Sequence, residues 1–404
     1  MTAPLAGLRV VELARILAGP WIGQTLADLG ADVVKVEAPE GDDTRRWGPP
    51  FIRRGDRAAS GELPDGGDEL EAAYFHCCNR GKRSVVADFG TPEGQQLVRA
   101  LAQRSDVLIE NFKVGGLKKF GLDYPALHAL NPRLVYCSVT GFGQRGPKSG
   151  HAGYDLMIQG MGGIMDLTGD PAGQPQRTGV AFADIFTGTY GVIAIQAALA
   201  QRERTGLGQH VDMALLDCMV AVLANQAMNY LASGEVPHRM GNAHPNIVPY
   251  QVFEVRDGHV IVAVGNDRQF REFCEVIQRP ELAAEPRYAT NAERVANRQV
   301  LVETIGHTLR GCSRAGLLPA LEARGVPCGP INSVAETFAD PQVIFRGMRV
   351  NLPAPDTLER AIPSVRTPIV FSDAELAVQR PAPRLGQHTD EVKRELGFSV
   401  ASST

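Results

Sequence analysis

The stretch from residue 5 to residue 37, LAGLRVVELARILAGPWIGQTLADLGADVVKVE, decides the fold of this chain. An apolar run at residues 9–13 predicts a strand, residues 21–29 have helical spacing, and residues 33–37 predict a second strand ending in an acid. These elements form the first unit of a doubly wound α/β sheet, with Glu37 at the position of the ribose carboxylate in dinucleotide-binding proteins. The turn before the helix lacks G-x-G-x-x-G. We therefore expect a nucleotide fold without the usual pyrophosphate site.

The composition indicates an enzyme-sized chain without a nucleic-acid surface. With 404 residues it has room for two domains, and a net charge of -4 argues against a nucleic-acid partner. Its seven cysteines, odd in number and without C-x-x-C spacing, predict reduced thiols and a cytoplasmic location. The most apolar helical segments, residues 191–200 and 213–228, are too short or too polar to cross a bilayer, so we expect no membrane association.

The α/β alternation continues beyond the first unit. Further strands are predicted at residues 84–88, 107–111 and 134–139, helices at 91–102, 185–201 and 214–231, and a long polar loop at 49–69. The turn Asp257-Gly258, between apolar runs at 250–255 and 259–264, predicts a β-hairpin.

The change of pattern near residue 240 predicts a second domain. We expect a large domain over residues 1–224, a small α+β domain over 225–325, and a segment over 326–404 that returns to the large domain.

A glycine-rich segment follows one of the predicted strands. Residues 141–146 match G-x-G-x-x-G, but Pro147 and the polar residues after it do not open a helix. A tight turn that lets a ligand or another chain come close is the favoured interpretation, with a dinucleotide site as the alternative.

Two aspartates stand before apolar segments that predict helices. Asp184 is either a plain N-cap or a nucleophilic carboxylate, and these roles are compatible. The positive end of a helix dipole and its free N–H groups would keep that carboxylate ionised. Asp155 follows Tyr154 and also precedes an apolar segment. The structural alternative to a functional role is N-capping for Asp155 and a hydrogen bond of the hydroxyl group for Tyr154.

Basic and polar side chains mark further candidate contacts. Asn111 and Phe112 end a predicted strand, and the lysines beyond them, including Lys119, could meet phosphates or form a solvated face. Arg45 and Arg46 are loop cations that either clamp a substrate carboxylate or lie in solvent.

The second domain also carries two candidate substrate residues. His244 precedes the predicted hairpin and Asn266 follows it, so their loops either cover a site or serve turn formation. No cluster in the sequence has metal-ligand spacing, and we expect no metal.

Together these segments resemble the class III CoA-transferase family, that of carnitine CoA-transferase and formyl-CoA transferase. The motifs that carry the resemblance, in order, are residues 5–37, 79–84, 110–112, 140–144, 153–155, 183–184, 325–330 and 385–389. Residues 243–251 and 265–267 look most like the succinyl-CoA:glutarate branch.

The resemblance implies a fold and a set of site residues. The fold would be α/β, with a Rossmann-like large domain built from both termini and a small α+β domain, in an interlocked-ring homodimer. Asp184 would be the nucleophile, with Tyr154 and Asp155 shaping the thioester pocket. Coenzyme A would be a substrate and not a resident cofactor, contacted by Arg15, Leu17, Ala87, Asn111, Phe112 and Lys119.

The resemblance also implies the reaction. An acyl-CoA donor such as succinyl-CoA would pass CoA to a carboxylic acid, expected to be a dicarboxylate, through an aspartyl-CoA thioester on Asp184. The alternative on the same fold is an acyl-CoA racemase or epimerase. The racemase branch has His-Asp where this chain has Tyr154-Asp155. This chain would therefore lack one of the two acid/base groups that move the α-proton, which favours transfer.

Overall fold

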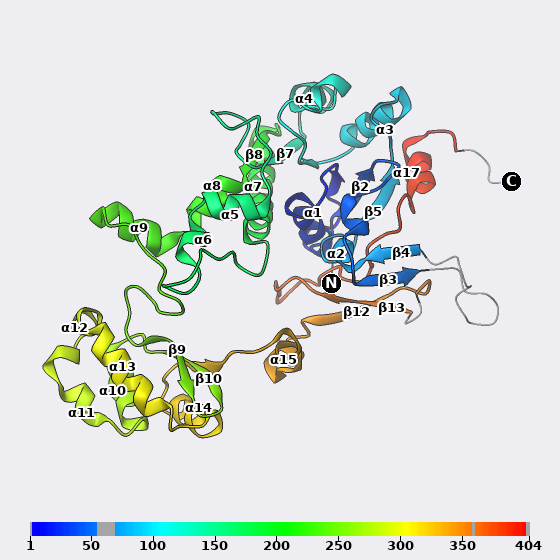
Figure 1. The fold of residues 1–404 in the computed structure, drawn as a ribbon. Helices are drawn as coiled ribbons and strands as arrows, with labels where there is room; N and C mark the ends of the chain where they lie inside the picture. Colours follow the sequence, from blue (N-terminus) through cyan, green and yellow to red (C-terminus); the bar gives the residue numbers. More distant parts are fainter. Residues whose placement is uncertain (1, 55–68, 358–359, 401–404) are drawn as a thin grey trace. The chain divides into compact units, whose positions relative to one another are not determined.

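The computed structural model describes residues 2–54, 69–357 and 360–400. The chain divides into two compact units (Figure 1). One comprises residues 1–164, 178–228 and 341–404, and the other comprises residues 165–177 and 229–340. The first unit therefore contains both ends of the chain. The division into domains at residues 224 and 325 stays a prediction.

A six-stranded parallel sheet forms the centre of the first unit (Figure 1). Its strands are β1 (Arg9–Glu12), β2 (Asp32–Glu37), β5 (Arg83–Val86), β6 (Val107–Glu110), β7 (Val135–Thr140) and β8 (His210–Ala214). Their order is β5-β2-β1-β6-β7-β8, so the order reverses between β1 and β6. Open parallel sheets bind ligands beyond the carboxyl ends of the strands at such a reversal.

Two hydrophobic cores lie on opposite faces of this sheet, because successive strand residues point to opposite sides. Val10 packs in the core that includes α1 (Ala18–Asp28) and α7 (Phe182–Thr205). Val11 packs in the core that includes α3 (Pro92–Gln103) and α17 (Thr389–Leu396). Helices on both faces of a parallel sheet confirm the predicted α/β class.

Short elements complete the chain. Around the sheet are η1 (Asp43–Arg46), β3 (Phe51–Arg54), β4 (Glu69–Ala72), α2 (Ala73–His76), η2 (Lys118–Phe120), α4 (Tyr124–Leu130), α5 (Asp155–Met161), α8 (Leu215–Ala221), α16 (Pro341–Phe345), β12 (Arg349–Pro353) and β13 (Ala361–Val365). Two helices, α6 (Ile164–Leu167) and α9 (Ala224–Ser233), begin in the first unit and end in the second. The second unit contains β9 (Tyr250–Val255), β10 (Gly258–Ala263), β11 (Cys328–Pro330), α10 (Asp267–Val276), α11 (Pro280–Ala284), η3 (Pro286–Tyr288), α12 (Asn291–Ala296), α13 (Arg298–Leu309), α14 (Arg314–Ala323) and α15 (Val334–Ala339).

The hairpin prediction is confirmed, since β9 and β10 pair antiparallel with Gly258 opposite Val255. The single helix predicted at 214–231 is wrong. Ala214 ends β8, and α8 and α9 are separate helices divided at residues 222–223, with the first residue of α9, Ala224, at a φ of 47°. Apolar spacing alone could not reveal that Ala214 pairs with Thr140 in the sheet.

The polar loop predicted at residues 49–69 is wrong at both of its ends. Strand β3 begins at Phe51 and pairs antiparallel with β4, which begins at Glu69. Residues 55–68 lie outside the described part of the chain.

Helix α7 is longer than its apolar core suggested. Its 24 residues pass a test of length and composition for a membrane span, which the core helices of soluble proteins also pass, whereas residues 191–200 alone are too short. Helices α8 and α9 pass the same test together, as a pair bent by 73°. One side of α7 packs closely on α1, because a Cβ on Gly191 would lie 2.4 Å from Ile22 Cδ1. Nearer the start of both helices, a Cβ on Gly188 would lie 3.0 Å from the Ala18 carbonyl oxygen.

Candidate active site

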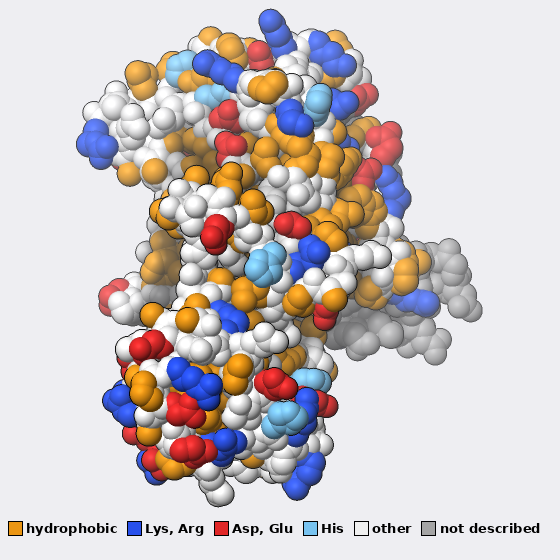
Figure 2. Space-filling model, turned by 60° about the vertical axis from the view of Figure 1, so that its left-hand side comes forward, with side chains coloured by type: hydrophobic (Ala, Val, Ile, Leu, Met, Phe, Trp, Pro, Cys, Tyr) orange, Lys and Arg blue, Asp and Glu red, His pale blue; other side chains and the backbone are white. Residues whose placement is uncertain are grey.

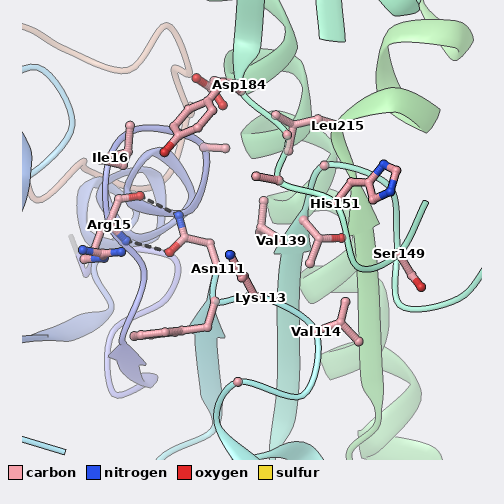
Figure 3. Close-up of a pocket in the computed structure, with 18 of the residues that line it drawn as sticks. Arg15, Ile16, Asn111, Lys113, Val114, Val139, Ser149, His151, Asp184 and Leu215 are labelled. Atoms are coloured by element: carbon pink, nitrogen blue, oxygen red, sulfur yellow. Dashed lines mark hydrogen bonds between the residues drawn. The ribbon is translucent and has the colours of Figure 1, made fainter. Parts of the chain in front are cut away.

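A cavity of about 510 Å³ lies beyond the carboxyl ends of β1, β6 and β7 (Figure 3). It stands at the reversal of the sheet order, all within the first unit. Figure 3 shows Asp184 toward one end of the cavity and Lys113 and Val114 toward the other. Its lining includes Arg15, Leu17, Asn111, Phe112, Lys113, Lys119, Thr140, Gly141, Ser149, His151, Tyr154, Asp155 and Asp184.

One wall joins the segments that follow β1 and β6. The Arg15 backbone N–H donates to Asn111 Oδ1 at 2.9 Å, and Asn111 Nδ2 donates to the Arg15 carbonyl at 2.7 Å (Figure 3). The Arg15 guanidinium carbon lies 5.9 Å from the centroid of the Phe112 ring. Asn111 thus links the two segments as well as lining the cavity.

A second wall depends on two glycines in direct contact. A Cβ on Gly141 would lie 2.6 Å from Gly153 Cα, and a Cβ on Gly153 would lie 2.4 Å from Gly141 Cα. Because neither residue has a side chain, the segment before α5 can lie directly against the end of β7. This contact sets where Tyr154 and Asp155 enter the cavity.

The Asp155 carboxylate connects α5 to α7. Its Oδ1 accepts the Ala183 N–H at 2.9 Å, and its Oδ2 accepts from Gln159 Nε2 at 2.7 Å. The predicted N-cap role of Asp155 in its own helix is wrong, because Tyr154 is the N-cap of α5. The carboxylate instead satisfies an N–H in the first turn of α7, which would otherwise lack a partner inside the helix.

Sequence reasoning missed Gln159. This fully buried side chain donates to Asp155 and accepts the Thr178 backbone N–H at 3.0 Å, so it ties α5 to the segment leading into α7. The available signal was its spacing, four residues after Asp155, which puts both side chains on one face of a helix.

Asp184 is the third residue of α7, within its first turn, and the prediction that it caps the helix is wrong because Ala181 is the N-cap. In the described part of the chain, no residue makes a hydrogen bond or ion pair with its carboxylate. Burial, and then the nearby Asp155 charge, raise the pKa of Asp184 to about 7. Burial therefore outweighs the helix terminus that we expected to keep it ionised.

We expect the rate of any reaction that uses ionised Asp184 as a nucleophile to increase with pH and to level off above about pH 7. Burial also raises the pKa of Glu110 to about 7, so the wild-type profile alone does not identify the group. Asp155→Asn separates the two, because removing the like charge lowers the pKa of Asp184. Turnover measured from pH 5 to 9 should show the inflection at lower pH in this variant, and an unmoved inflection would exclude Asp184.

The same pKa predicts an effect on stability. A carboxyl that binds its proton more tightly in the folded state than in the unfolded state makes folding less favourable as pH rises from about 4 to about 7. Asp184→Asn removes this penalty. Its thermal midpoint should exceed that of the wild type by more at pH 8 than at pH 5, and an equal difference at both pH values contradicts the assignment.

Arg45 is already engaged and does not line the cavity. Its guanidinium bonds both oxygens of Glu37, at 2.7 and 2.8 Å, and also pairs with Glu71. Although burial would raise the pKa of Glu37, the bonds from Arg45 outweigh it and lower that pKa. Glu37 therefore does not have the role of a ribose-binding carboxylate that its position suggested, because Arg45 and Ser84 already bond its oxygens.

Other predicted residues lie elsewhere. Arg46 is exposed and pairs with Asp43 at 3.6 Å. Ala87 is buried just after β5 and does not line the cavity. His244 and Asn266 belong to the second unit, where Asn266 caps α10 through a bond from the Gln269 N–H.

The glycine-rich segment at 141–146 forms a turn held by side chains. Thr140 Oγ1 accepts the Gly143 N–H, and Asp212 Oδ2 accepts the Gln144 N–H, both at 2.9 Å. The next helix in the described chain, α5, begins only at Asp155. A dinucleotide fingerprint instead opens a helix directly after its glycines.

The fold and cavity define an α/β protein with a cavity at the sheet reversal, lined by the carboxylate of Asp184. Among the described residues, no group of three or more His, Cys, Asp or Glu side chains could hold a metal ion.

Comparisons with known proteins agree over almost the whole length. Residues 5–389 match CoA-transferase family III. A succinate--glutarate CoA-transferase of Agrobacterium fabrum is 57% identical, covering 97% of this chain and 96% of its own. A succinyl-CoA:glutarate CoA-transferase of Mus musculus is 40% identical, covering 97% and 86%. The crystal structure of a CAIB/BAIF family protein from Brucella suis is 59% identical, with a TM-score of 0.84 over 98% of this chain and 100% of that one.

The chain belongs to CoA-transferase family III. It is an enzyme that acts on an acyl-CoA and a carboxylate, which confirms the family predicted from the sequence motifs.

Proposed function

We propose that this enzyme transfers CoA between succinyl-CoA and glutarate, and that Asp184 carries the CoA as a thioester during each turnover. The observation that carries the proposal is the unbonded Asp184 carboxylate, which lines the cavity at the sheet reversal. The names of relatives support the substrates. Those at 57% and 40% identity act on succinate or succinyl-CoA and glutarate, and one from Haloarcula hispanica at 38% acts on succinyl-CoA and mesaconate.

The reaction needs one carboxylate from the enzyme, and it replaces one thioester with another. Asp184 attacks the thioester carbonyl, forming an aspartyl-acyl anhydride and releasing CoA thiolate. The thiolate then attacks the aspartyl carbonyl, which forms the aspartyl-CoA thioester and releases the donor acid. The acceptor carboxylate reverses these two steps and leaves with CoA. Since one thioester replaces another, the steps balance without any further reactant.

Cations in the cavity lining support the CoA part of the proposal. Arg15, Lys113 and Lys119 all line it, beside the Asn111–Phe112 wall. CoA carries phosphates, and guanidinium and ammonium groups are their usual partners. In the Rossmann-like arrangement that we propose, the nucleotide lies over the β1–β6 reversal and the thioester reaches Asp184.

Lys119→Ala should raise the KM for succinyl-CoA by roughly 3–10-fold, because a charge-assisted bond to phosphate contributes on the order of 1 kcal/mol at an exposed site. The value of kcat should change little. Lys118→Ala is the matched control, because Lys118 is exposed in the same short helix and does not line the cavity. Equal KM values in these two variants would remove Lys119 from the proposed CoA site.

The choice of acceptor is tested by a panel of acids with succinyl-CoA as donor, with mass spectrometry of the new thioesters. Glutaryl-CoA should form faster than butyryl-CoA, because the second carboxylate distinguishes these acids. A monocarboxylate that matches glutarate would overturn the dicarboxylate assignment. For the racemase alternative, the same protein is incubated with a 2-methylacyl-CoA in deuterium oxide without acceptor, and deuterium at the α-carbon would favour it.

The proposed assembly is an interlocked-ring homodimer. Hydrophobic side chains gather in patches on the surface (Figure 2), and among those exposed on α7, α8 and the start of α9 are Ile193, Val220 and Met228, all in the first unit. Large apolar side chains grouped on neighbouring helices are typical of a surface that another chain covers. Sedimentation velocity at micromolar concentration should give the mass of two chains, and a monomer would exclude this assembly.

A further inference from the structure

The loop after β1 contains a backbone conformation that its residue type disfavours. Ile16 has a φ of 73°, in the left-handed region, where a β-branched side chain is a strong outlier. Ile16 and both of its neighbours, Arg15 and Leu17, line the cavity that contains Asp184. Such strain persists only when surrounding contacts hold it.

Two side chains bond the polar groups of Ile16 itself. Its backbone N–H is shared between the two carboxylate oxygens of Asp42, at 3.3 and 3.4 Å. Its carbonyl accepts from Cys78 Sγ at 3.5 Å. The reciprocal bonds between Asn111 and Arg15 hold the preceding residue. The strained turn is therefore held from several separate segments of the chain.

Asp42 is itself fixed by a buried ion pair. Its Oδ2 lies 2.9 Å from Lys35 Nζ, and both side chains are inaccessible to solvent or nearly so. Burial would raise the pKa of Asp42, but the Lys35 charge and the Thr44 N–H outweigh it and hold that pKa at about 2. Lys35 also donates to the Ala14 carbonyl at 2.8 Å. The pair thus bonds the loop on both sides of Arg15.

We propose that Asp42 is a positioning residue for acyl-CoA binding, and that it acts by holding Ile16 in its left-handed conformation. This inference rests on the proposed CoA site at the sheet reversal. Asp42 does not line the cavity, so it acts only through the turn. Without its carboxylate, Ile16 would relax to negative φ and would turn the Arg15 and Leu17 backbone away from the bound ligand.

A double-mutant cycle with glycine tests this mechanism. Glycine adopts positive φ without strain, so Ile16→Gly removes the need for Asp42 to hold the turn. Asp42→Ala in the wild-type background should raise the KM for succinyl-CoA about tenfold, with kcat within about threefold. In the Ile16→Gly background, the same Asp42→Ala change should raise KM by less than about threefold. Equal increases in both backgrounds would overturn the proposal.

Controls separate positioning from general stabilisation. Asp42 also accepts from Thr44 Oγ1 at 2.8 Å, so Thr44→Val disturbs the same carboxylate without touching its bond to Ile16, and KM should stay unchanged. If Asp42→Ala does not fold, the thermal midpoints of Ile16→Gly and Ile16→Ala decide. Strain predicts the higher midpoint for glycine, although glycine has the greater unfolded-chain entropy, and a higher midpoint for alanine would contradict the proposal.

Failure of this inference is distinguishable from failure of the proposed function. An additive cycle removes the role of Asp42 while leaving CoA transfer through Asp184 intact. Loss of the Asp184 requirement would instead remove the proposed function, whatever the result of the cycle.

Discussion

Asp184→Ala is expected to abolish CoA transfer, with a decrease in kcat of at least about 10⁴-fold. The proposed mechanism forms every covalent intermediate on this carboxylate, and no other acid in the cavity lining stands in the first turn of α7. The measurement is succinyl-CoA-dependent formation of glutaryl-CoA. In parallel, wild-type enzyme incubated with succinyl-CoA and then hydroxylamine should carry the modification on Asp184.

Asp217→Asn is the matched control for this loss. Asp217 is also an acid in the first turn of a helix, α8, but it is exposed and does not line the cavity. Its substitution should leave kcat within about twofold. Transfer that survives in Asp184→Ala, or an unmodified Asp184 peptide during turnover, would falsify the covalent mechanism.

Gly153→Ala is the second large effect that we expect, with a decrease in kcat of more than about 100-fold. Its Cβ would lie 2.4 Å from Gly141 Cα, so backbone must move. The displaced residues are Tyr154 and Asp155, and Asp155 bonds the N–H next to Asp184. A shift of about 1 Å at a reacting group can cost about 10²-fold in rate. Steady-state kinetics at pH 8 gives the measurement.

Gly150→Ala provides the comparison within the same loop. Gly150 has negative φ and open space where a Cβ would point, so the variant should keep both its activity and its thermal midpoint. Circular dichroism of Gly153→Ala distinguishes a displaced site from a lost fold. A folded Gly153→Ala enzyme with wild-type kcat would show that the glycine contact does not position Asp155.

Most elements of the sheet were predictable from the chain because buried parallel strands are short apolar runs. Residues 107–111 and 134–139 correspond to β6 (Val107–Glu110) and β7 (Val135–Thr140) to within one residue at each end. Helix breaks were less predictable. The run at 214–231 keeps helical spacing across residues 222–223, which separate α8 from α9, and alanine, a strong helix former, gives no sign of the φ of 47° at Ala224.

The sequence motifs identified the family, and through that resemblance they pointed to Asp184 and Asn111, both of which line the cavity. They could not establish which groups the acids meet. Asp155 accepts an N–H of α7, 28 residues further along the chain, instead of capping its own helix. Arg45 bonds Glu37 instead of a substrate because the fold brings these two buried side chains together.

The pKa of Asp184, about 7, likewise depends on tertiary structure. Burial outweighs the local field of its helix, and no single stretch of sequence encodes burial. Local patterning predicted most strands of the sheet, whereas long-range packing decided the pKa of Asp184 and the hydrogen-bond partners of Asp155 and Arg45.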